Sequence, residues 1–285
     1  MTNPLKIACI QMNSGNDMAA NIKDFEQMLA EAAGQGAVLA ATPENTFLMD
    51  SLNSEGTAPN NPKYRQQEHP GIKAALQATK KNGIWLLLGG VAVLPENDDG
   101  TNKTYNRSLL IDPEGSIAAG YNKIHLFDVD VGDGQAYVES ARYLAGDKPV
   151  VAKLGDVTLG MSICYDVRFP YLYRQMAQQG AQLLAVPAAF IEYTGKAHWH
   201  VLLRARAIEN GCFVIAPAQC GAHPGDRRTF GHSLIINPWG EVLADGCSEP
   251  GVVMADIDMD EVKKVRAKIP SLMHCRNNIM GDYSI

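Results

Sequence analysis

The sequence lacks the features that mark several large classes of protein. Among its 285 residues, 25 lysines and arginines stand against 31 acidic residues, so the net charge is −6 and there is no excess of basic charge. Nucleic-acid binding needs a basic stripe or patch, which mild acidity spread along the chain does not supply. The longest apolar run, 84–94, is too short and too rich in glycine to span a bilayer. Lys6 and Gln11 interrupt the apolar run near the start, so no signal peptide is expected. We predict a protein that binds neither nucleic acid nor membranes.

Cysteine is also scarce for a chain of this length. The six cysteines form no CxxC pair, and their density is far below that of a disulfide-stapled domain. Hydrophobic residues make up 46% and charged residues 20%, as in ordinary globular proteins. A chain this long buries roughly three quarters of its unfolded surface and needs no crosslinks. We therefore predict free thiols and a cytoplasmic location. The cysteines are Cys9, Cys164, Cys212, Cys220, Cys247 and Cys275.

Two common kinds of ligand-binding motif are missing or irregular. Neither GxGxxG nor GxxxxGK[ST] occurs, which excludes the usual phosphate-cradling loops. Residues of zinc-ligand type do occur, at His198, His200, Cys220 and His223. Their spacing is irregular, and His198 and His200 stand two apart on an expected helix, so they face apart. The spacing does not support a zinc site.

Short β-type runs alternate with helical patterns along the whole chain. Because the strands are separated by helices or hairpins, we expect helix-covered sheets in one continuous domain, 1–285. The polar segment 49–70 has the length of loops that are usually functional or mobile. Expected strands are 6–12, 37–41, 85–93, 157–163, 183–186, 213–216, 233–236 and 252–257, with a hairpin over 105–123. Expected helices are 19–33, 72–81, 169–179, 197–210 and 259–268.

One cysteine occupies a position typical of a nucleophile. Cys164 ends an apolar strand and precedes a segment in which Pro170 marks the first turn of a helix. Such a strand-to-helix turn exposes a side chain and aims backbone N–H groups at the atom that it attacks. A buried core cysteine is the alternative, and it describes Cys9 and Cys212, which lie within apolar strands. Cys247 and Cys275 lie in polar surroundings and are expected at the surface.

Three charged residues also follow strand-like segments. Glu44 comes after Pro43 at the end of the second strand, while Lys123 and Glu139 follow the hairpin. Strand ends are where α/β enzymes gather reacting groups, so a carboxylate could take the thiol proton and an ammonium could stabilise an oxyanion. Solvated charges or surface ion pairs are the alternative, since most Glu and Lys are exposed.

A cysteine–histidine pair of the papain kind is a further alternative. His198 or His232 would be its base.

Taken together, these segments resemble the nitrilase, or carbon–nitrogen hydrolase, superfamily nearly from end to end. Each motif alone is modest evidence, but their number and order are specific. The resemblance implies an α/β fold, a four-layer α-β-β-α sandwich, which agrees with the expected strands and helices. The motifs are Pro43-Glu44, Tyr121-x-Lys123-x-His125-Leu126-Phe127, Glu139-Ser140, Gly160-x-x-Ile163-Cys164-Tyr165-Asp166-x-Arg168-Phe169-Pro170, Ala197-His198-Trp199, Leu203-x-Ala205-Arg206-Ala207, Gly231-His232-Ser233 and Pro238-Trp239-Gly240.

The resemblance assigns a role to each candidate catalytic residue. Cys164 would attack an amide carbonyl, and Glu44 would take the thiol proton and later activate water. Lys123 would hold the oxyanion with the Tyr165 backbone N–H, and Glu139 would position substrate and base. The thioester formed as ammonia leaves would then be hydrolysed. No metal and no organic cofactor are implied.

Finer matches are similar to the branch of amidases that act on deaminated glutathione. They are Ala218-Gln219-Cys220-Gly221-x-His223, Arg228-x-Phe230-Gly231-His232-Ser233 and Thr194-Gly195. In this reading Arg168 would clamp a substrate carboxylate, and Phe190 and Thr194 would line the same pocket. An ion pair of Arg168 with Asp166 or Glu192 is the alternative. Other activities left open are an ω-amidase acting on 2-oxoglutaramate or 2-oxosuccinamate, a nitrilase, and a catalytically silent scaffold on the same fold.

Two departures from the family pattern bear on substrate specificity. The oligomeric state beyond a dimer is a separate question and stays open. Relatives usually carry glutamate where His200 stands, and often proline near Gly132. The resemblance implies at least a homodimer that packs through helices. It also raises the hypothesis that the segment 49–70 closes over the substrate.

Overall fold

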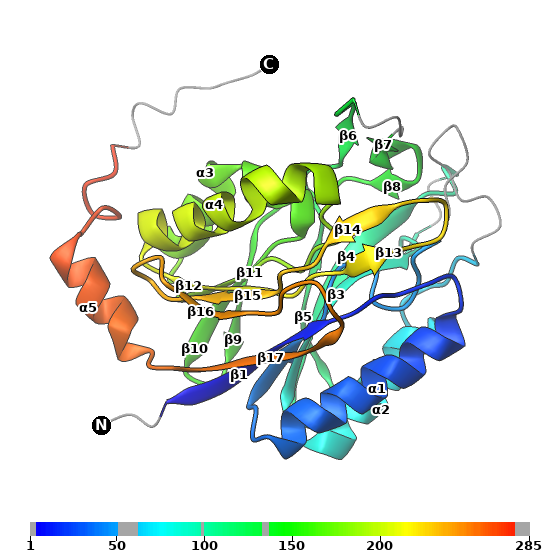
Figure 1. Cartoon of the computed structure of the whole chain (residues 1–285), viewed down its shortest axis with the longest axis horizontal. Helices are drawn as coiled ribbons and strands as arrows, with labels where there is room; N and C mark the ends of the chain where they lie inside the picture. The colour runs from blue at the N-terminus through cyan, green and yellow to red at the C-terminus, as the bar shows by residue number, and fades with distance from the viewer. Residues whose placement is uncertain (1–3, 51–61, 98–99, 133–136, 277–285) are drawn as a thin grey trace.

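The computed structural model describes residues 4–50, 62–97, 100–132 and 137–276. Figure 1 shows two β-sheets stacked face to face, with helices covering the outer face of each. The layers therefore run helix, sheet, sheet, helix. This is the α-β-β-α sandwich that the resemblance implied.

The first sheet is built around three parallel strands and a pair of hairpins. Strand β17, near the end of the chain, pairs antiparallel with β1 and so ties the two ends of the chain into one sheet. Strands β1, β2 and β3 are parallel, and β3, β4 and β5 follow as antiparallel neighbours. In order, the sheet contains β17 (Gly251–Ile257), β1 (Leu5–Gln11), β2 (Leu39–Ala41), β3 (Trp85–Val93), β4 (Thr104–Ile111) and β5 (Ile117–Asn122), with β8 (Tyr143–Leu144) paired to β4.

The second sheet repeats this plan with three parallel strands at its centre. Strands β10, β11 and β12 are parallel, and β9, β15 and β16 are antiparallel additions at the two sides. In order, the sheet contains β16 (Val242–Asp245), β15 (Leu234–Ile236), β12 (Phe213–Ala216), β11 (Leu183–Ala185), β10 (Val157–Met161) and β9 (Val150–Leu154). Two small ribbons pair β6 (Asp128–Val129) with β7 (Tyr137–Val138), and β13 (Cys220–Ala222) with β14 (Arg228–Phe230).

Helices connect the parallel strands and cover the sheets. Helices α1 (Met18–Gly34) and α2 (Pro70–Asn82) cover the first sheet, and α3 (Pro170–Gln178) and α4 (Glu192–Asn210) cover the second (Figure 1). Helix α5 (Asp260–Lys268) lies at one side, and two short 3-10 helices are η1 (Glu139–Ala141) and η2 (Cys164–Arg168). Local signals set the ends of α2, because His69 caps its start, Pro70 occupies its first turn and Gly83 ends it at φ 66°.

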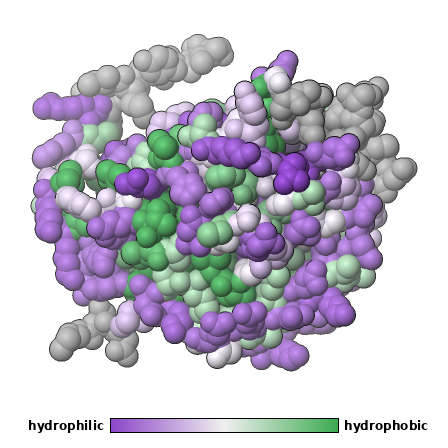
Figure 2. All heavy atoms as spheres, viewed as in Figure 1, coloured by the Kyte–Doolittle hydropathy of each residue, from purple (hydrophilic) through white to green (hydrophobic). Residues whose placement is uncertain are grey.

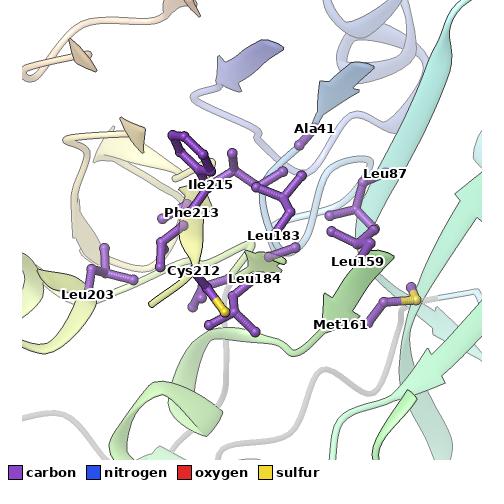
Figure 3. Packing of buried hydrophobic residues seen from close by; sticks show 14 of the residues in the cluster. Ala41, Leu87, Leu159, Met161, Leu183, Leu184, Leu203, Cys212, Phe213 and Ile215 are labelled. Carbon is purple, nitrogen blue, oxygen red and sulfur yellow. The ribbon is translucent and has the colours of Figure 1, made fainter. Parts of the chain in front are cut away.

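Strand alternation divides the core into two layers. Along β1, Ile7 and Cys9 belong to the cluster between the sheets, whereas Ala8 and Ile10 pack under α1 and α2. Both faces of the strand are thus buried, which explains why residues 7–10 are all apolar. Figure 3 shows the contact between the sheets, where Leu87 of β3 lies beside Leu159 of β10.

The predicted helix over 197–210 begins five residues too late. Helix α4 starts at Glu192, and its first turns include Gly195, which weakened the helical pattern. A Cβ at this position would lie 2.4 Å from Phe230 Cβ, so the glycine is needed for close packing of β14. Sequence periodicity also failed to predict several short elements, because short strands and 3-10 turns carry little periodicity. They are β6, β7, β8, β9, β13, β14 and β16, with η1 and η2.

Among the described residues, none of the helices combines the length and apolarity that crossing a membrane requires.

Candidate active site

Glu44 stands just beyond β2, in a turn that rests on two glycines of β3. A Cβ on Gly89 would lie 2.1 Å from the carbonyl oxygen of Pro43. A Cβ on Gly90 would lie 2.1 Å from Asn106 Oδ1 and 3.2 Å from Glu44 Cγ. The absence of side chains at these positions therefore lets the turn approach the sheet and buries the Glu44 carboxylate.

Lys123 is the centre of a buried charge cluster. Its ammonium Nζ donates to Glu44 Oε1 at 2.9 Å and to both oxygens of Glu139 at 2.9 and 2.8 Å. The amide of Asn106 donates to the same two carboxylates, at 2.8 and 3.3 Å. Because an unpaired buried charge is costly, the two carboxylates and the lysine must be kept together. The structure thus brings together the three charged residues for which the family resemblance implied a shared site.

The second carboxylate is oriented by the backbone. Glu139 opens the short helix η1, and the N–H of Phe127 donates to its Oε2 at 2.7 Å. The remaining hydrogen bonds of the carboxylate come from Lys123 and Asn106. The Glu139 carboxylate in turn fixes the orientation of the Lys123 ammonium.

Cys164 occupies the strand-to-helix turn that the sequence predicted. It follows β10, begins η2 and has a φ of 48°, a conformation rarely adopted by residues other than glycine. Its own N–H donates to the carbonyl of Pro187 at 2.9 Å. The next N–H, of Tyr165, lies in the first turn of the short helix, where backbone donors have no intrahelical acceptor. That N–H is available to an oxyanion beside the thiol.

The carboxylate of Asp166 stabilises the turn that carries Cys164. Its fully buried carboxylate accepts from the backbone N–H of Ile163 at 2.9 Å and from the hydroxyl of Tyr121 at 2.7 Å. His125 adds its backbone N–H at 3.1 Å and a contact from Nδ1 at 2.7 Å. These contacts link the nucleophile turn of one sheet to β5 of the other.

The protonation states follow from burial and from neighbouring charges. Burial raises the pKa of the Cys164 thiol well above 9.0, and the negative charge of Glu44 adds to this effect while Lys123 opposes it. Burial alone would raise the pKa of Glu44, but the Lys123 ammonium and a hydrogen bond from Cys164 hold that pKa below 4.5. At neutral pH the resting pair is therefore a thiol beside a carboxylate, which suits Glu44 to general-base work.

Lys123 stays charged despite its burial. Burial alone would lower its pKa, yet attraction to Glu139 and Glu44 raises the pKa well above the ordinary 10.5. A fixed cation next to the thiol stabilises negative charge that develops on a substrate oxygen.

An open cavity of about 580 Å³, its mouth included, gives access to these groups. Charged side chains form its floor and aromatic side chains its walls. It is lined by Glu44, Asn45, Asn106, Lys123, Phe127, Tyr137, Val138, Glu139, Arg142, Tyr143, Cys164, Tyr165, Ala189, Phe190, Ile191, Thr194 and Arg227.

Three of the four predicted substrate-binding residues line this cavity. They are Tyr165, Phe190 and Thr194. The buried hydroxyl of Thr194 has no hydrogen-bond partner among the described residues. Because buried polar atoms are nearly always paired, this hydroxyl is free to meet a bound molecule.

Arg168, the fourth, lies behind the cavity wall rather than in it. Its guanidinium carbon is 5.2 Å from the centroid of the Phe190 ring, and its Nη1 lies 3.3 Å from His198 Nδ1. The two ion-pair partners considered in the sequence analysis have other contacts, since Asp166 holds the nucleophile turn and Glu192 pairs with Lys196 and Arg228.

Sequence reasoning missed three polar residues of the site. Asn106 bridges the two carboxylates, and its signal was an amide side chain on the buried face of β4, between Thr104 and Ser108. Arg142 and Arg227 add positive charge to the lining, and each has a buried Nε without a partner among the described residues. No local pattern marks either arginine, because the fold alone brings them to the cavity.

Other residues singled out in the sequence lie elsewhere. His223 contacts the Ser14 carbonyl and the Thr229 hydroxyl, so it does not join His198 and His200. The thiol of Cys164 has a carboxylate neighbour, whereas His198 contacts Arg168 and His232 contacts Asp245. A papain-like pair is therefore wrong. The six cysteines are free, with Cys9, Cys164, Cys212 and Cys220 buried, Cys275 half-buried and Cys247 exposed.

Two hypotheses on loops fall largely outside the described residues. The lid suggested for 49–70 rests mainly on residues 51–61, and the departure near Gly132 continues into 133–136.

Known proteins resemble this chain along most of its length. The family model for carbon-nitrogen hydrolase matches residues 6–267. A deaminated glutathione amidase from Synechocystis is 43% identical over 278 residues, covering 95% of this chain and 98% of the relative. The human deaminated glutathione amidase is 37% identical and covers 98% of this chain and 84% of the relative.

The solved structures that resemble this chain point to the same family as the sequence relatives. The NitFhit protein of C. elegans superposes with a TM-score of 0.83 at 35% identity, covering 98% of this chain and 66% of that longer one. A mutant amidase from Nesterenkonia sp. AN1, with an acetamide moiety added covalently at its active-site cysteine, superposes with a TM-score of 0.80 at 25% identity, covering 99% and 97% of the two chains. With its fold, its buried thiol–carboxylate–lysine cluster and these relatives, the chain belongs to the carbon–nitrogen hydrolase family and is an amide-hydrolysing enzyme.

Proposed function

We propose that this enzyme hydrolyses the γ-amide of deaminated glutathione through a thioester on Cys164. The observation that carries the proposal is Lys123 held between two carboxylates beside a buried thiol. Relatives that share 37–43% of their residues with this chain are deaminated glutathione amidases.

The first half of the reaction forms the thioester. As the sulfur of Cys164 attacks the amide carbonyl, its proton passes to Glu44, and the carbonyl oxygen becomes an oxyanion. Lys123 and the Tyr165 backbone N–H stabilise this charge, which exists only in the transition state and the intermediate. The C–N bond then breaks, and the proton on Glu44 goes to the departing nitrogen.

The second half regenerates the thiol. Glu44 takes a proton from water, which attacks the thioester carbonyl, and the returning proton completes Cys164 as the acid leaves. Glu139 positions Lys123 through two hydrogen bonds. No metal and no organic cofactor are needed for either half.

The leaving group differs from the ammonia that the family resemblance implied. In deaminated glutathione the γ-amide nitrogen belongs to cysteinylglycine, so the amine of a dipeptide leaves. Asn45, Arg142, Tyr143 and Arg227 line both the catalytic cavity and a second, adjoining one, which extends the space next to the scissile bond. The two arginines suit the dipeptide carboxylate.

The acyl side of the substrate is an oxo acid. Its groups would meet Tyr165, Phe190 and the unpaired hydroxyl of Thr194. Arg168 would contribute positive charge from behind Phe190.

The assembly and location belong to the same proposal. We infer at least a homodimer formed through the outer helices, because α4 exposes Tyr193, Val201 and Ile208 on its outward side. We also infer one domain over 1–285, since β17 pairs with β1, and a cytoplasmic enzyme, since the cysteines are free thiols.

A comparison of two amides tests the substrate. Deaminated glutathione and 2-oxoglutaramate would place the same 2-oxoglutaryl group on sulfur, so the mass of the acyl-enzyme does not distinguish them. Steady-state rates do, with 2-oxoglutarate measured as the common product. We expect a higher kcat/KM for deaminated glutathione and, in Arg227→Gln, a selective loss on that substrate.

Two results would contradict the proposal. A much higher kcat/KM for 2-oxoglutaramate would identify an ω-amidase instead. Full activity in Cys164→Ala, a variant that removes only the sulfur, would exclude the thioester itself.

A further inference from the structure

We propose that His200, His232 and Asp245 form a binding site for a divalent transition-metal ion such as Zn²⁺, on the surface beside helix α4. The cluster lies apart from the groups of the proposed reaction.

The three side chains come from separate elements and converge. His200 lies on α4, His232 lies just before β15, and Asp245 ends β16. Their ligand atoms all lie within 4.8 Å of one another. Asp245 Oδ2 is 3.1 Å from His200 Nε2 and 3.1 Å from His232 Nδ1. Neighbouring ligands of a tetrahedral zinc ion are about 3.3 Å apart, so small movements would suffice for coordination.

The backbone around His232 holds the site in place. This residue has a φ of 53°, its N–H donates to the carbonyl of Cys247 at 2.6 Å, and its carbonyl accepts from Trp199 Nε1 at 2.8 Å. The Asp245 carboxylate also accepts from the Cys247 N–H at 2.8 Å. Helix α4 and the turn after β16 are thus both fixed relative to His232.

Aromatic packing orients the two imidazole rings. The Phe230 ring stacks on His232 with centroids 4.4 Å apart, and its edge contact with His200 has centroids 6.0 Å apart. Ligand rings that are already oriented lose less entropy when a metal binds.

Both imidazoles reach the same carboxylate oxygen, with His200 Nε2 and His232 Nδ1 each 3.1 Å from Asp245 Oδ2. Binding of the ion would release the protons that these ring nitrogens share with the carboxylate. Two imidazoles and one carboxylate suit zinc and similar ions of intermediate softness, and three protein ligands leave a fourth position to water. All three residues are partly exposed, so an ion can enter.

Isothermal titration with Zn²⁺ tests the site directly. The titration uses the full chain with Cys164→Ala, which removes the catalytic thiol as a competing ligand. We expect one ion per chain, and at least a roughly tenfold weaker affinity in His200→Gln and in Asp245→Asn. His274→Gln, at an exposed histidine of the C-terminal segment, is the matched control and should bind as the parent does.

Thermal unfolding separates loss of the site from loss of the fold. Each variant should melt near the parent without metal, and saturating Zn²⁺ should raise Tm in the parent and in His274→Gln but not in His200→Gln. The absence of binding to the parent would overturn the proposal. So would unchanged affinity in His200→Gln, or an affinity that depends on Cys247→Ser alone.

Discussion

At the scale of single residues, the site works because neighbours set each other's charge. Lys123 remains an ammonium because two carboxylates contact it, and Glu44 remains a carboxylate because Lys123 contacts it. Cys164 remains a thiol because it is buried next to that carboxylate. The proton therefore leaves the sulfur during attack, when the Lys123 ammonium stabilises the oxyanion that is forming.

Replacing Glu44 by glutamine tests the assigned base. We expect kcat to fall by about 10²- to 10⁴-fold, the usual contribution of a general base, while the side chain keeps its size. The thiol pKa should also fall, because Glu44 raises it and Lys123 would remain as the neighbouring charge. The pH dependence of alkylation by iodoacetamide reports this shift.

Glu192→Gln is the matched control for this substitution. Glu192 pairs with Lys196 and Arg228 at the surface, so kcat and the alkylation profile should stay as in the parent. An unchanged alkylation profile in Glu44→Gln would contradict the coupling between carboxylate and thiol.

At the scale of elements, short local contacts place the catalytic turns. Helix α2 starts where Nδ1 of His69 accepts from the N–H groups of Gly71 and Ile72, at 3.1 and 3.4 Å. The turn that carries Glu44 reaches its place only because β3 has glycine at 89 and 90. The cap depends on one nitrogen atom of His69, and the position of the turn depends on the absence of a Cβ at residues 89 and 90.

The His69 cap predicts a dependence of stability on pH. Burial lowers the pKa of His69 from 6.5 to about 4, so between these values the unfolded chain binds a proton that the folded chain does not. The free energy of unfolding should therefore fall as pH drops from 6.5 towards 4, by on the order of 3 kcal/mol from this residue. Urea titrations across this range measure it.

An uncharged cap should remove this contribution. His69→Asn can still accept the two backbone hydrogen bonds, so its stability should vary less with pH than that of the parent. His223, whose pKa burial also lowers to about 4, leaves a residual slope. An equally steep slope in His69→Asn and the parent would rule out this origin.

Gly90→Ala tests the close approach at β3. The added Cβ would lie 2.1 Å from Asn106 Oδ1, so Asn106 must move and release its bonds to Glu44 and Glu139. We expect at least a tenfold loss of kcat, because small displacements of catalytic groups are costly. Gly34→Ala is the control, since nothing lies within 4 Å of a Cβ there. Parent-like kcat in Gly90→Ala would show that the turn adapts.

At the scale of the whole molecule, one face of the sandwich carries an exposed apolar patch. Figure 2 shows hydrophobic residues gathered over α4 and the strands beside it, and the exposed ones include Val242 and Leu243 of β16. The exposed apolar side chains of this region include Val201 at 67% and Ile208 at 50% exposed. An exposed apolar patch of this kind marks an interaction site, which supports the inferred homodimer.

Val201→Glu tests the assembly. A charge in the middle of an apolar helix interface should shift the protein towards monomer in sedimentation velocity, with folding checked by circular dichroism. Lys23→Glu, an exposed change on α1 in the opposite layer, should leave the assembly as in the parent. A dimer that tolerates Val201→Glu would place the interface elsewhere.

The predicted helices and strands agree with the structure where the hydrophobic pattern lies within the element itself. The strand 85–93 and the strand 213–216 have the predicted ends, and the turn at Cys164 follows its strand as predicted. Elements with a weak period were missed or shortened, as at β9 and at the start of α4. Alternation and helical periodicity report only which face of one element is apolar.

The sequence by itself determined the order of the main strands and helices, the α/β class and which residues stand at the strand ends. Only the tertiary structure decided that Glu44 and Lys123, 79 positions apart, share a hydrogen bond, and that Arg168 lies behind Phe190. It also brought His200 to Asp245. The physical reason is one of range: propensity and periodicity act within an element, whereas burial, charge pairing and cavities arise where elements meet.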